Sequence, residues 1–292
     1  MDQAAQLRNV IKMRSRSEEA AKARVFTITS GKGGVGKSNV AVNLAVQFRK
    51  LGKRVVIFDA DLGLANVEVM FGSIPKYNLS DLIYRGKSMK EIITPGPLDI
   101  GFISGGSGIM ALNNLSRDQI NYLVRSLSEL DQLADVVLID TGAGISDSVM
   151  EFVLASAEIL LVATPEPSSL TDSYSLLKAL FRNPNFPQDE AEIHVIANKV
   201  LSKEDAEAVY EKLDTVVHQF LKGDLHYLGM IPQDTQLEKA VRQQKTVSLL
   251  YPEAQSAKAF EVLAKNLLNH EQKEYVMKRG FLQMLAGLVG KA

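Results

Sequence analysis

A glycine-rich segment at residues 31–38 carries the residue types that bind phosphate groups. Its glycines let the backbone adopt positive φ and turn its N–H groups toward an anion. Its second lysine, Lys37, can bring a positive charge to the β- and γ-phosphates, and the hydroxyl of Ser38 can ligate Mg²⁺. The segment fits the pattern G-x-x-x-x-G-K-[ST] through Gly31-Lys32-Gly33-Gly34-Val35-Gly36-Lys37-Ser38, and it predicts a site for a nucleoside triphosphate and Mg²⁺.

Acidic residues follow two other apolar runs. Asp59 and Asp61 end the second run, and their spacing of two places both on one side of an extended chain. Asp140 closes the run Val136-Val137-Leu138-Ile139, where a P-loop protein carries an acid that holds Mg²⁺. The segment Thr141-Gly142-Ala143-Gly144 that follows predicts a mobile sensor of the γ-phosphate.

The elements that position these residues alternate in type along the chain. Short β-branched runs alternate with longer amphipathic stretches, which is typical of a parallel sheet covered by helices. Strands are predicted at 25–29, 55–58, 100–103, 136–139, 159–163, 193–197 and 226–231. Helices are predicted near 37–50, 116–133, 147–156, 168–182, 203–221 and 252–269. We expect an α/β P-loop NTPase fold of three layers, a mostly parallel sheet of about seven to eight strands with helices on both faces.

Composition divides the chain into three parts. Residues 1–23 are polar and locally basic, which predicts a mobile N-terminal arm. Residues 24–272 contain no linker rich in proline or glycine and no repeat, so a single P-loop domain is expected there. Residues 273–292 are amphipathic at helical spacing.

Composition also excludes several kinds of chemistry. The net charge of −1 provides no global field that attracts nucleic acid, so no specific nucleic-acid partner is expected. The absence of cysteine excludes disulfides, thiol nucleophiles and iron–sulfur clusters. The histidines at 194, 218, 226 and 270 show no metal-ligand spacing, so we interpret each as an ordinary surface or core residue. No apolar run reaches the roughly 18–20 residues that span a bilayer, and no signal-peptide core is present, so a cytoplasmic protein is expected.

Lys32, directly after the first glycine, is not required by an ordinary P-loop. With this lysine the chain resembles the MinD/ParA family of deviant Walker ATPases, whose signature it is. The resemblance implies that Lys32 reaches across an ATP-dependent dimer interface to the partner's phosphates, and that Lys37 and Lys32 assist hydrolysis. It also implies that Asp61 orients the attacking water and that Asp59 holds Mg²⁺ through its water shell. Gly142 stands where the family often has proline, which is expected to loosen the sensor loop.

The base is expected to contact two further segments. Asn198, in Ala197-Asn198-Lys199, has an amide that can donate to and accept from a base. Pro232, in Ile231-Pro232-Gln233-Asp234, is expected to pack on the base, which the family resemblance gives as adenine. The guanine motif N-K-x-D fails because Leu201 occupies its acidic position.

The C-terminal stretch is the candidate for membrane contact. One helical stripe flanked by Lys278, Arg279 and Lys291 suits an interface of anionic lipid, although a helix docked on its own domain has the same periodicity. MinD-type proteins end in a reversible membrane-targeting helix, and the resemblance favours the inner face of the cell membrane. The stripe comprises Met277, Phe281, Met284, Leu285 and Leu288, widened by Leu282 and Val289.

The N-terminal arm matches a short motif, D-Q-A-x-x-L-R. That motif resembles the FlhG branch of the MinD group, also called FleN or YlxH, which regulates flagellar number and position. The resemblance implies stimulation of an FlhF-type signal-recognition-particle GTPase, with components of the flagellar switch complex as a further candidate partner. The matching residues are Asp2, Gln3, Ala4, Leu7 and Arg8.

Two other functional classes remain open. A ParA-type DNA partition ATPase would share the nucleotide site but bind DNA non-specifically through basic residues. A metabolic P-loop enzyme, such as a carboxylating ligase, would have no use for either terminal segment, and a nitrogenase-type reductase is excluded by the absence of cysteine.

Deletion of residues 274–292 tests the membrane interpretation of the tail. The truncated chain should keep its basal ATPase rate and lose flotation with anionic vesicles, because the apolar stripe would be gone while the P-loop domain stays whole. An insoluble product would instead indicate a helix that belongs to the core of the domain.

Overall fold

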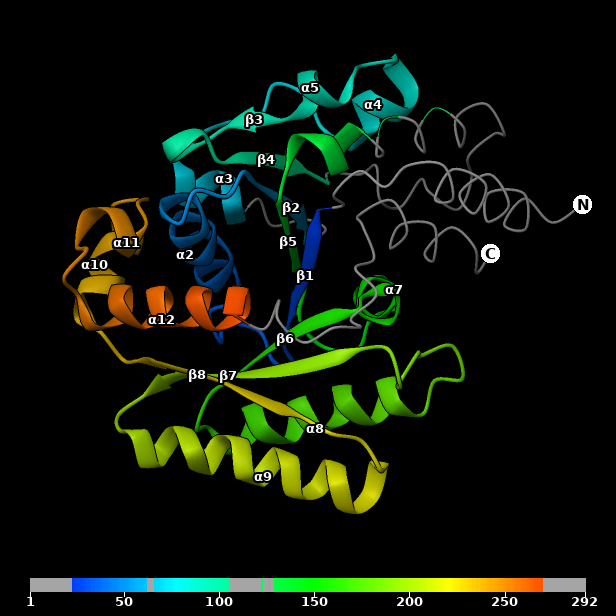
Figure 1. Cartoon of the computed structure of the whole chain (residues 1–292), viewed down its shortest axis with the longest axis vertical. Coiled ribbons are helices and arrows are strands. Elements are labelled where there is room, and N and C mark those ends of the chain that lie inside the picture. The colour runs from blue at the N-terminus through cyan, green and yellow to red at the C-terminus, as the bar shows by residue number, and fades with distance from the viewer. Residues whose placement is uncertain (1–22, 62–65, 106–121, 123–125, 127–128, 270–292) are drawn as a thin grey trace, which may run out of the picture.

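An eight-stranded sheet forms the centre of the protein in the computed structural model, which describes residues 23–61, 66–105, 122, 126 and 129–269 (Figure 1). Its strand order is β3-β4-β2-β5-β1-β6-β7-β8. All neighbouring strands are parallel except β3, which is antiparallel to β4. The strands are β1 (Arg24–Thr29), β2 (Val55–Ala60), β3 (Thr94–Pro95), β4 (Gly101–Ser104), β5 (Val136–Thr141), β6 (Glu158–Ala163), β7 (Glu192–Val200) and β8 (His226–Pro232).

Helices connect the strands and cover the sheet. Residues 129–133 are also helical. The helices are α2 (Lys37–Lys50), α3 (Asn66–Phe71), α4 (Leu79–Arg85), α5 (Met89–Ile92), the 3₁₀ turn η1 (Pro97–Asp99), α7 (Asp147–Ala155), α8 (Pro167–Phe181), α9 (Lys203–Leu221), α10 (Thr235–Arg242), α11 (Val247–Leu250) and α12 (Gln255–Asn269).

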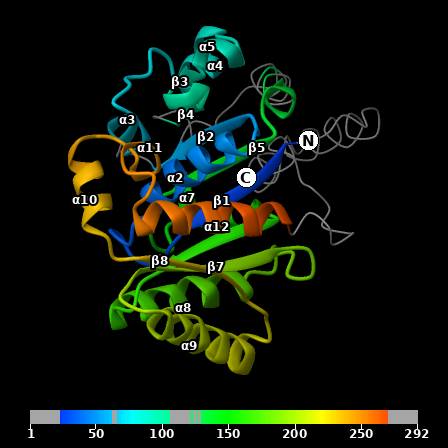
Figure 2. The same ribbon diagram turned by 60° about the vertical axis from the view of Figure 1, so that its left-hand side comes forward.

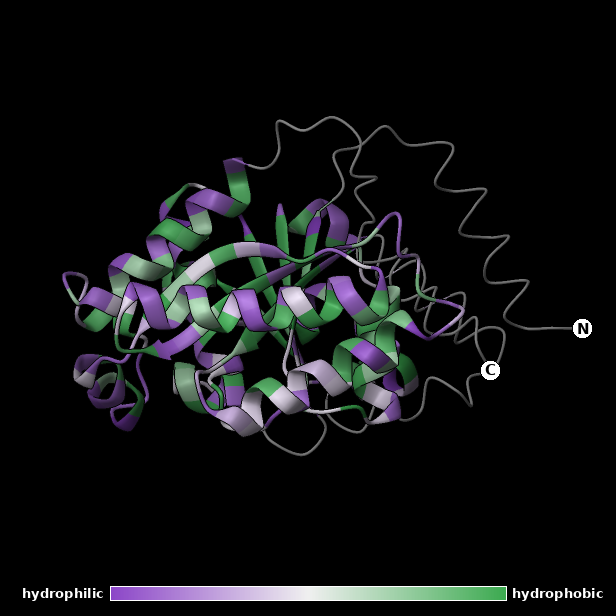
Figure 3. Cartoon of the chain, turned by 90° about the horizontal axis from the view of Figure 1, so that it is seen from below, coloured by the Kyte–Doolittle hydropathy of each residue, from purple (hydrophilic) through white to green (hydrophobic). Residues whose placement is uncertain are grey.

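The helices lie on both faces of the sheet, so the fold has three layers. On one face α2 and α12 pack together against the central strands and β8. On the other face α8 and α9 cover β6 and β7, while α4, α5 and α7 cover β2 and β5 (Figure 2). The central strands are buried along their length because both of their faces are covered, and most of their residues are apolar (Figure 3). The predicted fold class is confirmed.

All seven predicted strands are present, together with the two-residue strand β3. The described part of the predicted helix at 116–133 is helical at 122, 126 and 129–133. The predictions missed the short helices between residues 66 and 92 and between 235 and 250. Each of these is between four and eight residues long, too short to show a helical period in the sequence.

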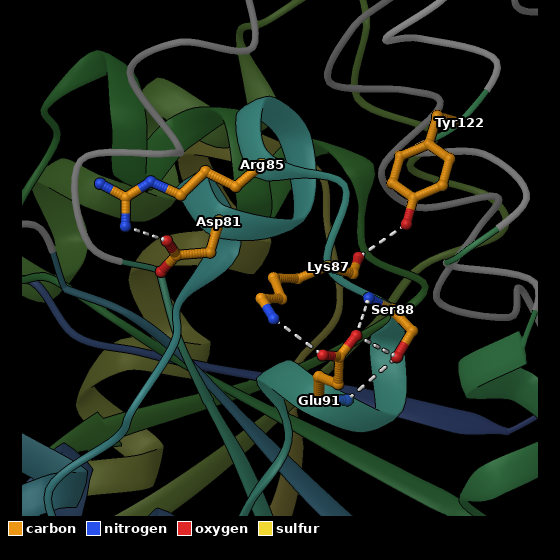
Figure 4. A network of polar contacts seen from close by, with 6 residues as sticks. All are labelled: Asp81, Arg85, Lys87, Ser88, Glu91 and Tyr122. Atoms are coloured by element: carbon orange, nitrogen blue, oxygen red, sulfur yellow. Dashed lines mark hydrogen bonds and ion pairs between the residues drawn. The ribbon is translucent and has the colours of Figure 1, made fainter.

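Local capping forms two of the missed helices. The side chains of Asn78 and Ser88 each accept a hydrogen bond from a backbone N–H of the helix that follows. In return, the carboxylates of Asp81 and Glu91 accept the backbone N–H of Asn78 and of Ser88, respectively. Figure 4 shows Glu91 between the Ser88 backbone and the ammonium of Lys87. The pattern of Ser or Asn followed three residues later by an acid was visible in the sequence and could have located both helices.

The terminal segments lie mostly outside the described residues. The tail stripe and the motif at residues 2–8 both lie outside the described residues, so both stay predictions. Ala23, which the sequence assigned to the arm, is fully buried in the core. Among the described residues no helix is long and apolar enough to cross a membrane.

Gly31 packs directly against the backbone of α8. A Cβ at this position would lie 2.1 Å from the carbonyl carbon of Asp172 and 2.2 Å from the amide nitrogen of Ser173. Backbone atoms of a helix that is packed on the sheet cannot move aside as a flexible side chain can. The first glycine of the phosphate loop is therefore required by helix packing, and not only by phosphate contact.

Substitution of Gly31 by alanine should lower the free energy of unfolding of the nucleotide-free chain by about 1–3 kcal/mol, because α8 must shift to admit the methyl group. Gly33→Ala is the matched control, since a Cβ at Gly33 has no neighbour within 4 Å. Urea denaturation measures both variants. Equal stability of the two would contradict the packing role of Gly31.

Candidate nucleotide site

The phosphate loop runs from the end of β1 to the start of α2. Gly36 caps α2 with a φ of 103°, which residues with a Cβ rarely adopt, and no side chain bonds to the first turn of this helix. The first N–H groups of α2 are thus left for another acceptor. This arrangement suits an anion at the helix N-terminus, where the helix dipole is positive.

Lys37 points into the site from the first turn of α2. Its ammonium donates a 3.0 Å hydrogen bond to the hydroxyl of Ser30, and the residue is only 8% exposed. Burial lowers the pKa of Lys37, and the charges of Asp140 and Asp61 oppose that change. The loop therefore holds a largely desolvated cation, which interacts strongly with an incoming phosphate.

Two carboxylates lie side by side beneath the loop. Asp59 on β2 and Asp140 on β5 are paired in register, and they are 4% and 0% exposed. Burial raises the pKa of each to about 7; Asp140 adds to the rise at Asp59, while the nearby Ser38 hydroxyl and the Lys37 ammonium oppose the rise at Asp140. Apart from the nearby Ser38 hydroxyl, neither carboxylate oxygen of Asp140 has a hydrogen-bond partner among the described residues. Such a pair fits a divalent cation, which compensates both charges.

Asp61 lies one residue beyond the end of β2, so the extended geometry predicted for it is only partly present. Its backbone N–H donates to Asp59 at 3.1 Å, and its carboxylate accepts from Asn66 at 3.1 Å. A Cβ on Gly142 would lie 3.3 Å from the Asp61 carboxylate. Asp61 therefore lies against the sensor loop that follows β5.

The loop at 141–144, predicted to sense the γ-phosphate, bonds at one end to β1 and at the other to the residue that follows β1. The Thr141 hydroxyl donates to the carbonyl of Ile28 at 2.9 Å. The N–H of Gly144 donates to the carbonyl of Ser30, also at 2.9 Å. Because Ser30 directly precedes the phosphate loop, the two loops are joined through this residue.

Asn198 braces the phosphate loop from behind. Its amide donates to the carbonyl of Val35 at 2.7 Å, and the side chain is 3% exposed. Its oxygen accepts the N–H of Lys199 at 2.9 Å, and the Lys199 ammonium donates to the carbonyl of Gly34. The sequence did not foresee this bracing, and the base contact of Asn198 stays a prediction.

A pocket of about 440 Å³ lies beside the loop, and Pro232 is part of its wall. It opens between the ends of β6, β7 and β8. This is the edge where ligands of parallel α/β sheets bind. Thr164, Pro165, Glu166, Lys199, Leu201, Asp205, Gln233, Asp234, Leu237 and Glu238 form the rest of the wall.

Lys32 contacts its own chain. Its ammonium donates to Glu166 at 2.8 Å and to the Ser168 hydroxyl at 2.6 Å, at the start of α8. The hydrogen bond and charge of Lys32 hold the pKa of Glu166 below its usual range. The side chains of Lys32 and Glu166 are 35% and 58% exposed, so water screens this ion pair and its net contribution is small.

The comparisons with known proteins agree with this geometry. Residues 26–247 match the family model described as the CobQ/CobB/MinD/ParA nucleotide binding domain. The chain belongs to this family. The antiactivator FleN of Pseudomonas aeruginosa is 39% identical over 84% of this chain and 86% of its own length. The flagellum site-determining protein YlxH of Helicobacter pylori is 35% identical over 84% of this chain and 82% of its own. The FleN/YlxH branch recognised from the N-terminal motif is thereby confirmed.

Solved structures show the same fold. MinD of Pyrococcus furiosus has a TM-score of 0.65 and 26% identity, and covers 85% of this chain and 99% of its own. MinD of Pyrococcus horikoshii, solved with Mg-ADP, has a TM-score of 0.66 at 24% identity and covers 87% of this chain and 100% of its own. This MinD/ParA protein is an ATPase, and the predicted enzyme class is confirmed.

The pH dependence of stability tests the buried acids of this MinD/ParA ATPase. Because the pKa values of Asp59 and Asp140 are about 7 in the folded chain and 3.8 is the usual value, the folded state binds more protons between these limits. The free energy of unfolding without nucleotide should therefore fall as pH rises from 5 to 7, by up to about 1.4 kcal/mol per unit for each carboxyl group, and level off above. Asp140→Asn should remove at least about half of this decline, because Asp140 also raises the pKa of Asp59.

Urea denaturation at several pH values measures the decline. Asp135→Asn is the matched control, because a hydrogen bond from Arg54 holds the pKa of Asp135 below its usual value, outside this range. A decline that is unchanged in Asp140→Asn, or equally reduced in the control, would contradict the assignment.

Proposed function

We propose that this chain is an ATP-controlled dimer of the FleN/FlhG type, which attaches reversibly to the cytoplasmic face of the membrane and regulates the number and placement of flagella. The flagellar assignment is supported by the likeness to FleN and YlxH along most of both chains. The observation that supports the dimer switch is the position of Lys32. It lies at the rim of the phosphate loop, held by two exposed side chains rather than buried in the site.

The proposed ATP site uses the groups beneath and around the loop. The loop N–H groups and Lys37 hold the phosphates, while Ser38, Asp59 and Asp140 hold Mg²⁺. The bound cation neutralises charge on the β- and γ-phosphates. Asp61, beside the sensor loop, orients the water that attacks the γ-phosphate in line.

Lys32 couples the nucleotide to dimerisation in this proposal. In one chain the lysine bonds to Glu166 and Ser168, and this weak contact is exchanged for the partner's phosphates. Two bound nucleotides repel each other across an interface, so a cation from each chain is needed to hold them face to face. ATP then favours the dimer, and hydrolysis returns the chain to the monomer.

In this proposal the terminal segments attach the dimer to the membrane and to its partner proteins. A single weak amphipathic helix binds a bilayer poorly, whereas two copies in a dimer bind by avidity. Membrane attachment is therefore expected with ATP and lost with ADP. The arm with Gln3 and Arg8 is proposed to stimulate the FlhF-type GTPase, and components of the flagellar switch complex are further proposed partners.

The two lysines of the loop should fail in different ways. Lys37→Ala should lose ATP binding and with it the dimer, because the phosphate charge is left unmatched inside the loop. Lys32→Ala should still bind ATP but stay monomeric, because its charge is needed only across the interface. Lys203→Ala is the control, since Lys203 is exposed on α9 and pairs with Glu207.

Light scattering after size exclusion, with ADP, ATP or a non-hydrolysable analogue, measures the dimer, and flotation with anionic vesicles measures attachment. A Lys37→Ala dimer that persists with ATP would contradict the ATP switch. If the wild-type chain binds DNA in an ATP-dependent, salt-sensitive way and does not float with vesicles, a DNA partition function would replace the membrane proposal.

A further inference from the structure

A row of ionisable side chains lies at the edge of the sheet opposite the phosphate loop. The parallel strands begin at this edge, and each of the last four strands in the sheet order contributes to the row. The neighbouring strands β1, β6, β7 and β8 supply Arg24, Glu158, Glu192, His194 and His226, each within the first three residues of its strand.

Strand register brings the row together on one face. Glu158 is paired with Glu192 across β6 and β7, and His194 is paired with His226 across β7 and β8. Because side chains alternate along a strand, Glu192 and His194 share a face. The next residues on that face, Ile196 and Leu228, pack in the core beneath α2 and α12.

The ligand atoms of the row are close in space. The Nε2 of His194 lies 3.3 Å from a carboxylate oxygen of Glu192. One ligand atom each from Glu158, Glu192 and His194 lie within 4.8 Å of one another. The rings of His194 and His226 have centroids 5.5 Å apart. His194 is 1% exposed, whereas His226 is exposed and can turn toward the group.

Arg24 orients Glu158 from the side. Its guanidinium donates to both oxygens of Glu158 and also, at 2.6 Å, to the carbonyl of Leu267 in the last turn of α12. Each carboxylate oxygen has a second lone pair, so this bidentate contact still leaves Glu158 able to accept elsewhere. Carboxylates fixed in this way are typical of metal ligands, whose outer contacts hold them in place.

We propose that Glu158, Glu192, His194 and His226 bind one divalent transition-metal ion of the zinc class. Imidazole and carboxylate ligands suit Zn²⁺, Co²⁺, Ni²⁺ or Mn²⁺, whereas Mg²⁺ and Ca²⁺ prefer oxygen ligands alone. The 3.3 Å separation of His194 and Glu192 already matches the edge of a tetrahedron with metal–ligand bonds of about 2.0–2.1 Å, an edge of roughly 3.3 Å. The bound ion joins β6, β7 and β8 beneath the end of α12.

This site is distinct from the Mg²⁺ site proposed for ATP hydrolysis. The two lie at opposite ends of the parallel strands, and they share no residue. The metal would act on the start of the strands and on the turn of α12 that Arg24 contacts. We therefore expect it to stabilise the fold without taking part in hydrolysis.

Metal titration of the untagged full chain tests the site. The chain is freed of metal and held in excess Mg-ADP, which occupies the nucleotide site. Addition of Co²⁺ should produce a visible absorption band that saturates at one Co²⁺ ion per chain. Zn²⁺ should displace the Co²⁺ and remove the band. His226→Ala should lower the Co²⁺ affinity at least about tenfold. Glu192→Gln, which changes a half-buried residue, should do the same, and His194→Gln should abolish the band.

His218→Ala is the matched control, because His218 is an exposed histidine on α9 near an acid, Asp224, and is not among the proposed ligands. It should bind Co²⁺ as wild-type does. Zn²⁺ should also raise the midpoint of thermal unfolding in wild-type and in His218→Ala, but not in His226→Ala. Because His226 is exposed, its replacement by alanine is expected to leave the fold intact. Absence of a saturable band in wild-type, or a band that survives in both His226→Ala and Glu192→Gln, would overturn the proposal.

Discussion

The pairing of Asp59 with Asp140 is the constraint on which the nucleotide site depends. The order of β2, β5 and β1 places these two acids in register beside the loop that carries Lys37. Both acids are nearly inaccessible to water, so the folded chain without ligand bears an electrostatic cost. A divalent cation between the two acids would remove that cost, so the proposed Mg²⁺ site would also stabilise this part of the core.

The loop around this pair is fastened to elements that are distant in the sequence. Asn198 holds the loop from β7, Gly144 bonds to the residue before it, and α8 packs on Gly31. The phosphate loop is therefore in direct contact with β7 and α8 and lies beside the loop that follows β5. Lys32 donates a hydrogen bond to Glu166, the residue just before the first turn of α8. The residue proposed to reach the partner chain is therefore also in contact with α8.

Much of the site was predictable because its residues follow strands along the chain. Residues 31–38 and the acids at 59, 61 and 140 all lie at strand ends, and parallel strands bring their ends to one edge. The short helices were missed because they are too short to show a helical period, and α4 and α5 are set by their capping residues instead. The bracing by Asn198 and the contact of Lys32 with Glu166 join residues more than 130 positions apart, for which the linear sequence contains no signal.

The sequence alone determined the P-loop, the layered α/β fold and the family, because glycine, lysine and β-branched patterns act over a few residues. The tertiary structure decided what distant residues do to one another. It raised the pKa of two acids by burying them together, made Gly31 a packing residue, and brought His194 and His226 side by side although their spacing along the chain is unlike that of metal ligands. Burial and strand order are properties of the whole fold, so no local pattern contains them.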